Sequence, residues 1–441
     1  LGYSADSFAA VRDGIVEAIA AADAGLAPAR LRLAVGTLRG VAINRSLPAY
    51  ERNPAAERAR YGDDRTDVTM TLLRLDAAGG TPRGVVSWFP VHATSMGNDN
   101  HLISGDNKGY AAQRFERAMA GGTPPFVAAF AQSHEGDTSP NIFGGTDGGG
   151  ADDFASTALS GEKQFAAALA LWREAAIDLS GPVDSRLSYV EMDAVAVAPE
   201  FADGQPRHTC PAAIGVSMLA GAEDGPGVGW EGVGCAPPAT LVERALCAAT
   251  ASECQGAKPI ALEMGRHDPP WSPDVLPLQV ARIGALAIVA APFELSTMAG
   301  RRLLDTVRAA LAPAGVRWAV VAGLANAYSG YITTPEEYAA QHYEGASTHF
   351  GPWSLGAVRQ TVAELAAALR DGRPAAPGPA PRDPDPEPWS LHPPVLFDAV
   401  PLGATIGAVA HDAAPAYQRG ETARASFWGG HPQHDLQRGD T

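Results

Sequence analysis

The sequence lacks several features that would place it in a specialised class of protein. It has no run of about eighteen apolar residues, so no transmembrane helix is expected. The longest apolar stretches, such as residues 285–292, have the length of a strand. Basic residues are also scarce, with 33 Lys and Arg against 49 Asp and Glu. The resulting net charge of −16 argues against a nucleic-acid partner, which would require a basic surface.

Common active-site signatures are missing too. The chain has no H-E-x-x-H, no G-x-S-x-G and no P-loop. It starts at Leu1 without a charged-then-apolar signal segment, and it stops at Thr441 inside an expected turn. We therefore expect both ends to be cut points in a longer protein.

The cysteines are few and close together. There is no C-x-x-C and no Cys/His metal spacing, which makes a zinc ribbon unexpected. An even number of cysteines in a loop-rich segment favours two disulfides and an oxidising compartment. The alternative is that all four are unpaired, partly buried thiols: Cys210, Cys235, Cys247 and Cys254.

Apolar periodicity predicts alternating helices and buried strands, and therefore a mixed α/β fold with a β-sheet core surrounded by helices. Helices are expected at residues 6–24, 107–120, 165–179, 296–311 and 355–369. Strands are expected at residues 31–35, 68–75, 85–91, 126–131, 276–283, 285–291, 318–322 and 422–428. Residues 203–240 are rich in Gly and Pro and predict a long irregular excursion.

Polar side chains directly follow four of the buried strands. They are His92, the segment 132–141 with Ser139, Glu294, and the group Asn326, Tyr328 and Tyr331. Because sites in α/β proteins lie beyond the carboxyl ends of strands, these four loops could line one crevice.

The available groups suit a hydrolase, since His and Glu bind zinc and a serine can act as a nucleophile. Each residue also has an ordinary structural explanation. His92 could be a hydrogen-bonded core residue, Glu294 could favour a helix dipole, and Ser139 could serve a turn before Pro140.

A set of motifs in fixed order resembles the neutral ceramidase family over nearly the whole chain. The matching segments are NRS (44–46), AY (49–50), NP (53–54), ERARY (57–61), WFPVHATSM (88–96), SGDNKGY (104–110), FAQ (130–132), GDTSPN (136–141), APFE (291–294), ANAYSGYITT (325–334), EY (337–338) and QHYEG (341–345).

The resemblance implies roles for particular positions. His92, Glu294 and Tyr331 resemble three of the family's four zinc ligands, and Ser139 resembles its essential serine. Arg45 and Tyr343 resemble residues that line its active site. The family links a cysteine pair that matches Cys210 and Cys254, and Cys235 with Cys247 would form an extra pair.

The resemblance also divides the chain into domains. It implies a catalytic domain over residues 1–414, with a proline-rich crossing at 373–390, and the start of an immunoglobulin-like domain at 415–441. The family's first zinc histidine lies upstream of residue 6, outside this sequence, so residues 1–441 alone are expected to have little activity. One departure is His134, where the family usually has Asn.

The implied activity is zinc-dependent hydrolysis of the amide bond of ceramide, at a membrane surface or in micelles, by a secreted or periplasmic enzyme. Zinc would activate water and polarise the carbonyl, while Ser139 contacts the scissile group or acts as a covalent nucleophile. Tyr343 and Arg45 would stabilise the oxyanion or hold the sphingoid hydroxyls. The alternative is an inactive or lipid-binding relative with an incomplete metal site.

Overall fold

The computed structural model describes residues 5–122, 125–237, 239–250, 252–382 and 399–429. Contacts divide the chain into two units. The larger comprises Ala27–Asp383, and the smaller comprises Leu1–Leu26 with Pro384–Thr441. All the candidate site residues belong to the larger unit.

The larger unit contains a first sheet of five strands in the order β5-β4-β3-β1-β7. Strands β4 and β5 are parallel, and the other neighbours are antiparallel. Apolar side chains of helices α4 and α5, among them Phe115 and Phe165, pack against this sheet. The bounds are β1 Ala29–Thr37, β3 Thr69–Ala77, β4 Pro82–Trp88, β5 Val127–Ala131, β7 Ile177–Leu179, α4 Asp106–Ala118 and α5 Asp153–Glu174.

A second sheet has four strands in the order β18-β16-β15-β8, with β16 and β18 parallel. Helices α7 and α10 bury their apolar faces against it in the largest hydrophobic cluster. Ser296 caps α7 by accepting a hydrogen bond from the Ala299 amide, as its position before the apolar run predicts. The bounds are β8 Val183–Glu191, β15 Val275–Ile283, β16 Leu286–Ala290, β18 Trp318–Ala322, α7 Thr297–Leu311 and α10 Ser354–Arg370.

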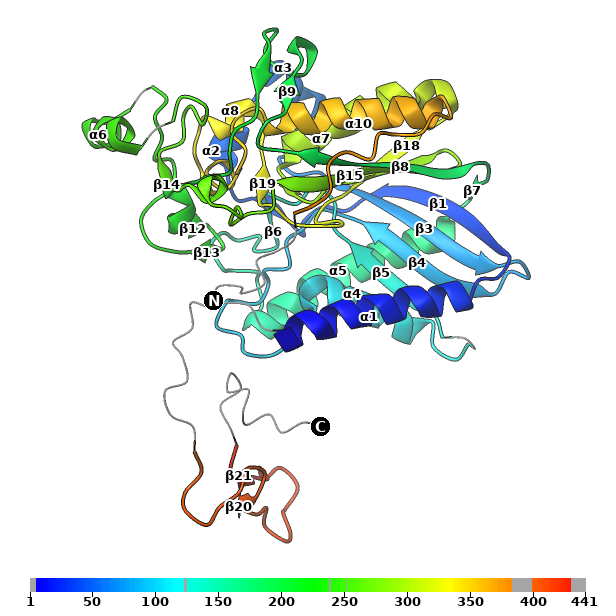
Figure 1. Cartoon of the computed structure of the whole chain (residues 1–441). Coiled ribbons are helices and arrows are strands. Elements are labelled where there is room, and N and C mark those ends of the chain that lie inside the picture. The colour runs from blue at the N-terminus through cyan, green and yellow to red at the C-terminus, as the bar shows by residue number, and fades with distance from the viewer. Residues whose placement is uncertain (1–4, 123–124, 238, 251, 383–398, 430–441) are drawn as a thin grey trace. The chain divides into compact units, whose positions relative to one another are not determined.

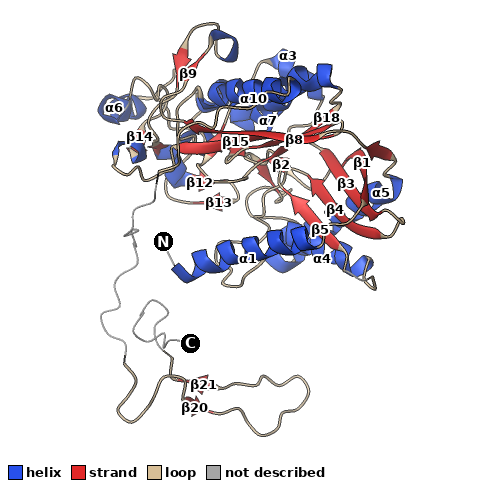
Figure 2. Cartoon of the chain, turned by 45° about the vertical axis from the view of Figure 1, so that its right-hand side comes forward, coloured by secondary structure: helices blue, strands red, loops and turns tan. Residues whose placement is uncertain are grey.

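The two sheets pack face to face, which gives four layers in the order helices, sheet, sheet, helices (Figure 1). A third apolar cluster fills the space between the sheets, with Leu33 and Leu73 from the first and Leu286 and Val320 from the second. Figure 2 shows the strands of both sheets between the two helical layers. The expected mixed α/β architecture is therefore confirmed.

One expected helix has other bounds, and one long strand was not expected. The helix expected at 165–179 ends at Glu174, because Ala175 is extended and Ile177–Leu179 pairs with β1 instead. Strand β8 was missed, because it is mostly exposed and its charged residues break the apolar pattern. It still pairs with β15 along its full length.

The excursion at 203–240 consists of short elements held by the two disulfides. Cys210 is bonded to Cys254, and Cys235 to Cys247, as the resemblance implied.

The remaining short elements of the larger unit are β2 Ile43–Asn44, β6 Thr138–Ser139, β9 Ala196–Val197, β10 Arg207–His208, β11 Ile214–Gly215, β12 Gly221–Ala222, β13 Gly225–Pro226, β14 Ile260–Leu262, β17 Glu294–Leu295, β19 Tyr331–Ile332, α2 Leu47–Tyr50, α3 Ala55–Arg58, α6 Leu241–Thr250, α8 Pro335–Tyr338 and α9 Tyr343–Ala346. Single 3₁₀ turns lie at Ala59–Tyr61, Pro199–Phe201, Val216–Ala220, Met264–Arg266 and Ala312–Ala314.

The smaller unit contains helix α1, Ala5–Ala24, and an antiparallel pair of strands, β20 Val409–His411 and β21 Ser426–Phe427. This pair spans the expected domain boundary at 414/415. Part of the proline-rich crossing at 373–390 and the end of the expected C-terminal domain fall outside the described residues. Among the helices that the structure describes, none combines the length and the apolarity that a bilayer crossing demands.

Candidate active site

Short ladders of two residue pairs bring the candidate residues together at the ends of the buried strands. After β16 and β18, strands β17 and β19 run parallel with Glu294 opposite Tyr331. After β5, strand β6 pairs with β2, with Ser139 opposite Ile43. Arg45 follows β2 directly, and its amide donates to the Asp137 carbonyl. These pairings place groups from distant parts of the sequence around one point.

His92 reaches the same point from the loop after β4. Its backbone amide donates to the Thr138 carbonyl at 3.0 Å, and its ring Nδ1 lies 3.1 Å from the same oxygen. Its Nε2 lies 2.8 Å from Oε2 of Glu294. The other carboxylate oxygen of Glu294 accepts from the Tyr328 hydroxyl at 2.6 Å.

The hydrogen bonds of His92 indicate what this centre can bind. A carbonyl oxygen can only accept, so Nδ1 must carry a proton, and in a neutral ring Nε2 then presents a lone pair. That lone pair faces a carboxylate oxygen of Glu294, which is also an acceptor. Two acceptors at this distance require a proton or a cation between them. A backbone carbonyl on the far ring nitrogen is also the usual support of a metal-binding histidine. The donor set therefore fits zinc.

Arg45 is the central cation of the site and is buried. Its guanidinium donates to Glu344 at 2.9 Å, to Asp224 at 3.0 Å and to the Gly136 carbonyl at 2.9 Å. One amino group also donates to the Tyr331 hydroxyl at 3.2 Å. Its guanidinium carbon lies 5.5 Å from the Tyr343 ring centre, so one side chain holds both phenols.

A cavity of about 360 Å³ opens over this cluster. Its walls are Arg45, His92, Ala93, Thr94, Gln132, Glu135, Ala222, Asp224, Gly225, Glu294, Leu324, Tyr331 and Tyr343. A larger cavity of about 490 Å³ is lined by residues 38–44, 47, 63–66, 68 and 89, and none of the expected catalytic, zinc-binding or substrate-contacting residues is among them. Size therefore does not identify the site here, whereas the chemistry of the walls does.

Ser139 is placed differently from the other candidates. It is buried and is not among the cavity's wall residues, and its hydroxyl oxygen accepts from the Asn141 amide at 3.1 Å. The structure thus brings Arg45, His92, Glu294, Tyr331 and Tyr343 to one cavity and places Ser139, in β6 opposite Ile43, outside its wall.

Burial and neighbouring charges set the protonation of these groups. Burial raises the pKa of Tyr331 well above its usual value, although Arg45 opposes the rise, so the phenol is neutral. Burial acts in the same direction on Glu294, but its hydrogen bonds, with His92 first and Tyr328 next, outweigh burial and lower its pKa. Glu135 has no hydrogen-bond partner for either carboxylate oxygen, and burial together with Glu294 raises its pKa.

Sequence reasoning missed two carboxylates that support the site. Glu344 lies inside the QHYEG motif, and its role in holding Arg45 could have been suspected from the neighbouring Tyr343. Asp224 carries only a turn signal, the following Gly-Pro-Gly, inside the irregular excursion. Nothing local indicates that it reaches the site.

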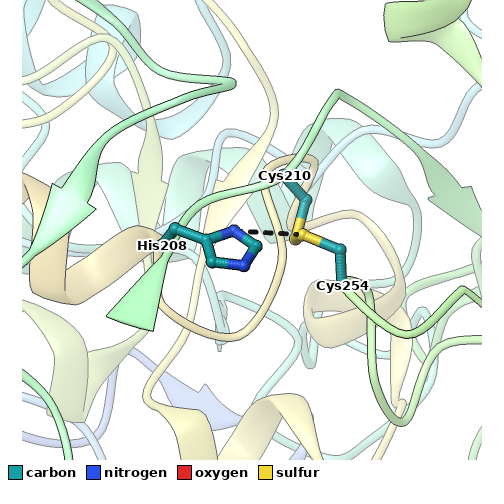
Figure 3. Close-up of side chains that lie close together, drawn as sticks. All are labelled: His208, Cys210 and Cys254. Carbon is teal, nitrogen blue, oxygen red and sulfur yellow. Dashed lines mark hydrogen bonds between the residues drawn. A yellow bond between two sulfur atoms is a disulfide. The ribbon is translucent and has the colours of Figure 1, made fainter. Parts of the chain in front are cut away.

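A second cluster, of His208, Cys210 and Cys254, has the composition of a metal site (Figure 3). Its two sulfur atoms form a disulfide, however, and metals bind the thiolate form of cysteine. His208 Nδ1 lies 3.6 Å from Sγ of Cys254. This cluster is therefore a disulfide with a neighbouring histidine. It is not a second candidate metal centre beside His92 and Glu294.

Fold and site together define a mixed α/β protein with a histidine–carboxylate–phenol centre in a buried pocket. The family descriptions "Neutral/alkaline non-lysosomal ceramidase, N-terminal" and the corresponding C-terminal one match residues 1–360 and 362–441. The chain belongs to the neutral/alkaline ceramidase family.

Named relatives agree with this assignment. The chain is 40% identical to neutral ceramidase B of Dictyostelium discoideum over 475 aligned positions, which cover 99% of the chain and 66% of that protein. It is 41% identical to the neutral ceramidase of Pseudomonas aeruginosa, again over 99% of the chain and 66% of that protein. The chain thus spans slightly less than two thirds of the length of these relatives.

Solved structures show the same fold. A structure described as "Ceramidase complexed with C2" superposes with a TM-score of 0.84 at 40% identity, covering 99% of this chain and 68% of that one. The crystal structure of the P. aeruginosa neutral ceramidase gives a TM-score of 0.80 at 38% identity, covering 99% and 67%.

Proposed function

We propose that this protein hydrolyses the N-acyl bond of ceramide, with zinc held by His92, Glu294 and Tyr331. The observation that carries the proposal is the contact of 2.8 Å between the Nε2 atom of His92 and the Glu294 carboxylate, with Nδ1 fixed by the Thr138 carbonyl. Family membership supplies the substrate class, since the matched relatives are named neutral ceramidases.

A bound zinc ion would lower the pKa of a water molecule and polarise the amide carbonyl. In the reaction, water adds to the amide carbon, the C–N bond breaks, and the nitrogen leaves with a proton as the amine of sphingosine. The acyl group leaves as a fatty acid. An amide requires this help because it is a weak electrophile with a poor leaving group.

The chain's own residues would position and stabilise the substrate. Arg45 and Tyr343 face the cavity and would donate hydrogen bonds to the developing oxyanion or to the sphingoid hydroxyls. The neutral phenol of Tyr331 is a weak ligand that Arg45 keeps oriented. Ser139 would contact the scissile group, either through a hydrogen bond or as a covalent nucleophile.

The test is made on the full-length gene product. Zinc content is measured by elemental analysis, and release of sphingosine and fatty acid is followed with ceramide in detergent micelles. We expect about one zinc ion per chain, equal amounts of the two products, and loss of activity on chelation that added zinc reverses. Stoichiometric ceramide binding without products would support a lipid-binding relative and contradict the proposal.

Two further features belong to this proposal. The two disulfides fit an oxidising compartment, which supports a secreted or periplasmic protein. We also propose that residues 415–441 begin an immunoglobulin-like domain, for which the pair β20–β21 and the C-terminal family match offer partial support. Limited proteolysis of the full-length protein followed by mass spectrometry would locate that domain boundary.

A further inference from the structure

The hairpin β12–β13 brings one acidic side chain into the pocket from the excursion at 203–240. Gly221 pairs with Pro226 and Ala222 with Gly225, so only Glu223 and Asp224 form the turn. Gly221 has a φ of +69°, and a Cβ there would lie 2.1 Å from the Gly225 carbonyl oxygen, so a side chain cannot be accommodated. The backbone therefore holds the tip of the hairpin in one conformation.

The two tip residues make different contacts. Glu223 is exposed and accepts a hydrogen bond from the Gly145 amide at 3.0 Å. Asp224 has a side chain only 2% exposed and forms part of the cavity wall. One Asp224 carboxylate oxygen accepts from Arg45 at 3.0 Å, and the other accepts from the Thr94 hydroxyl at 3.0 Å.

Two groups thus hold this carboxylate, Arg45 and Thr94. Burial alone would raise the pKa of Asp224, but the charge of Arg45 together with hydrogen bonding outweighs burial and lowers it. The second carboxylate on Arg45 behaves differently, because burial raises the pKa of Glu344. Asp224 is therefore the Arg45 partner that stays ionised most readily.

We propose that Asp224 is a positioning residue of the active site, which orients the Arg45 guanidinium toward the substrate. This role rests on the proposed function. An ionised carboxylate only accepts hydrogen bonds, so its two oxygens fix the Arg45 N–H group and the Thr94 hydroxyl that donate to them. The guanidinium is thereby held at the pocket wall.

The consequence is that Asp224 links the excursion to the active site, although it does not need to touch the reacting atoms. Arg45 and Thr94 come from loops that lie 179 and 130 residues from Asp224 in the sequence. One carboxylate thus joins the segments after β2 and β4 with the excursion.

The test compares Asp224→Asn with the neighbouring control Glu223→Gln in the full-length, zinc-loaded protein. The amide keeps the volume of Asp224 but removes one acceptor and presents a donor to its cationic partner. We expect kcat for ceramide in micelles to fall at least about tenfold. KM and zinc content should stay near the wild-type values, whereas Tm should fall because the buried ion pair with Arg45 is broken. Glu223→Gln should leave kcat within about twofold of wild type, since it lies outside the pocket.

A double-mutant cycle with Thr94→Val separates positioning from simple stabilisation. Thr94→Val alone should lower kcat less than Asp224→Asn, and it should add no further loss in the Asp224→Asn background. An unchanged kcat in Asp224→Asn, or a loss of kcat matched by an equal loss of zinc, would overturn the positioning role. A wild-type protein that does not hydrolyse ceramide would instead overturn the proposed function itself.

Discussion

Glu294 and Tyr331 lie directly opposite each other in a parallel ladder of two residue pairs, although they are separated by a complete helix and strand, α7 and β18. The ladder extends the parallel pairing of β16 with β18 beyond the end of the sheet. A carboxylate and a phenol are thereby fixed by backbone hydrogen bonds. This explains how a centre drawn from separate loops is built without a local sequence motif.

Replacing Ser139 by alanine should lower ceramide hydrolysis by at least about a hundredfold while zinc remains bound, because Ser139 would act on the substrate, whereas the side chains of His92 and Glu294 bond to each other, to Thr138 and to Tyr328. Turnover and zinc content of the purified variant provide the measurement. Ser160→Ala, a buried serine of α5 on the far side of the first sheet, is the control. Wild-type turnover in Ser139→Ala would show that Ser139 has no part in the reaction and serves only as a turn residue.

Removing the two disulfides separately should lower stability to different extents. Cys210–Cys254 closes a span of 44 residues and Cys235–Cys247 a span of 12. Chain-entropy arguments give about 4 and about 3 kcal/mol respectively, mainly through the unfolded state. Paired serine variants compared by scanning calorimetry should therefore show the larger fall in Tm for Cys210→Ser with Cys254→Ser. The reverse order would show that strain or residual structure dominates.

Two helical glycines should respond to alanine with opposite signs. A Cβ at Gly109 in α4 meets no atom within 4 Å, so Gly109→Ala should stabilise the protein by up to about 1 kcal/mol. A Cβ at Gly300 in α7 would lie 2.2 Å from the buried ring of His134, so Gly300→Ala should destabilise it by about 1–3 kcal/mol. Denaturant unfolding checks both, and stabilisation by Gly300→Ala would contradict the packing described here.

The contact of 3.0 Å between the Asp67 carboxylate and Nε2 of His134 should make stability depend on acid pH. Burial opposes the charged carboxylate, but hydrogen bonding and charge from His134 lower the pKa of Asp67 well below its ordinary value. A depressed folded-state pKa stabilises the protein above the unfolded pKa of about 3.9, and this stabilisation is lost as the pH falls below it.

Asp67→Asn should therefore cost about 1–3 kcal/mol at pH 7 and progressively less below pH ~4. Unfolding curves across this range measure the difference from wild type. The exposed neighbour Asp63→Asn is the control and should have little effect at any pH. A destabilisation by Asp67→Asn that grows as the pH falls would contradict this predicted pH dependence.

The architecture could be predicted largely from the sequence because the buried strands are continuous apolar runs, and β18 was expected with the bounds that it has. The same runs indicated that His92 and Glu294 follow strand ends. Strand β8 could not be predicted, since its pairing with β15 compensates for an exposed, charged sequence.

The supporting carboxylate Asp224 could not be predicted for a different reason. Its role arises when an irregular hairpin folds back onto loops more than a hundred residues away, and no local periodicity encodes that contact. His134 is the opposite case. The sequence marked it as a departure from the family, and the structure accommodates its ring against Gly300, where a side chain would not fit.

The most direct test of the central claim is the zinc content of Glu294→Ala measured beside Ser139→Ala and wild type in the full-length protein. The carboxylate of Glu294 faces Nε2 of His92, so its removal should abolish zinc binding and ceramide hydrolysis together. Ser139→Ala should lose hydrolysis and keep about one zinc ion per chain. Stoichiometric zinc in Glu294→Ala would contradict the metal centre proposed here.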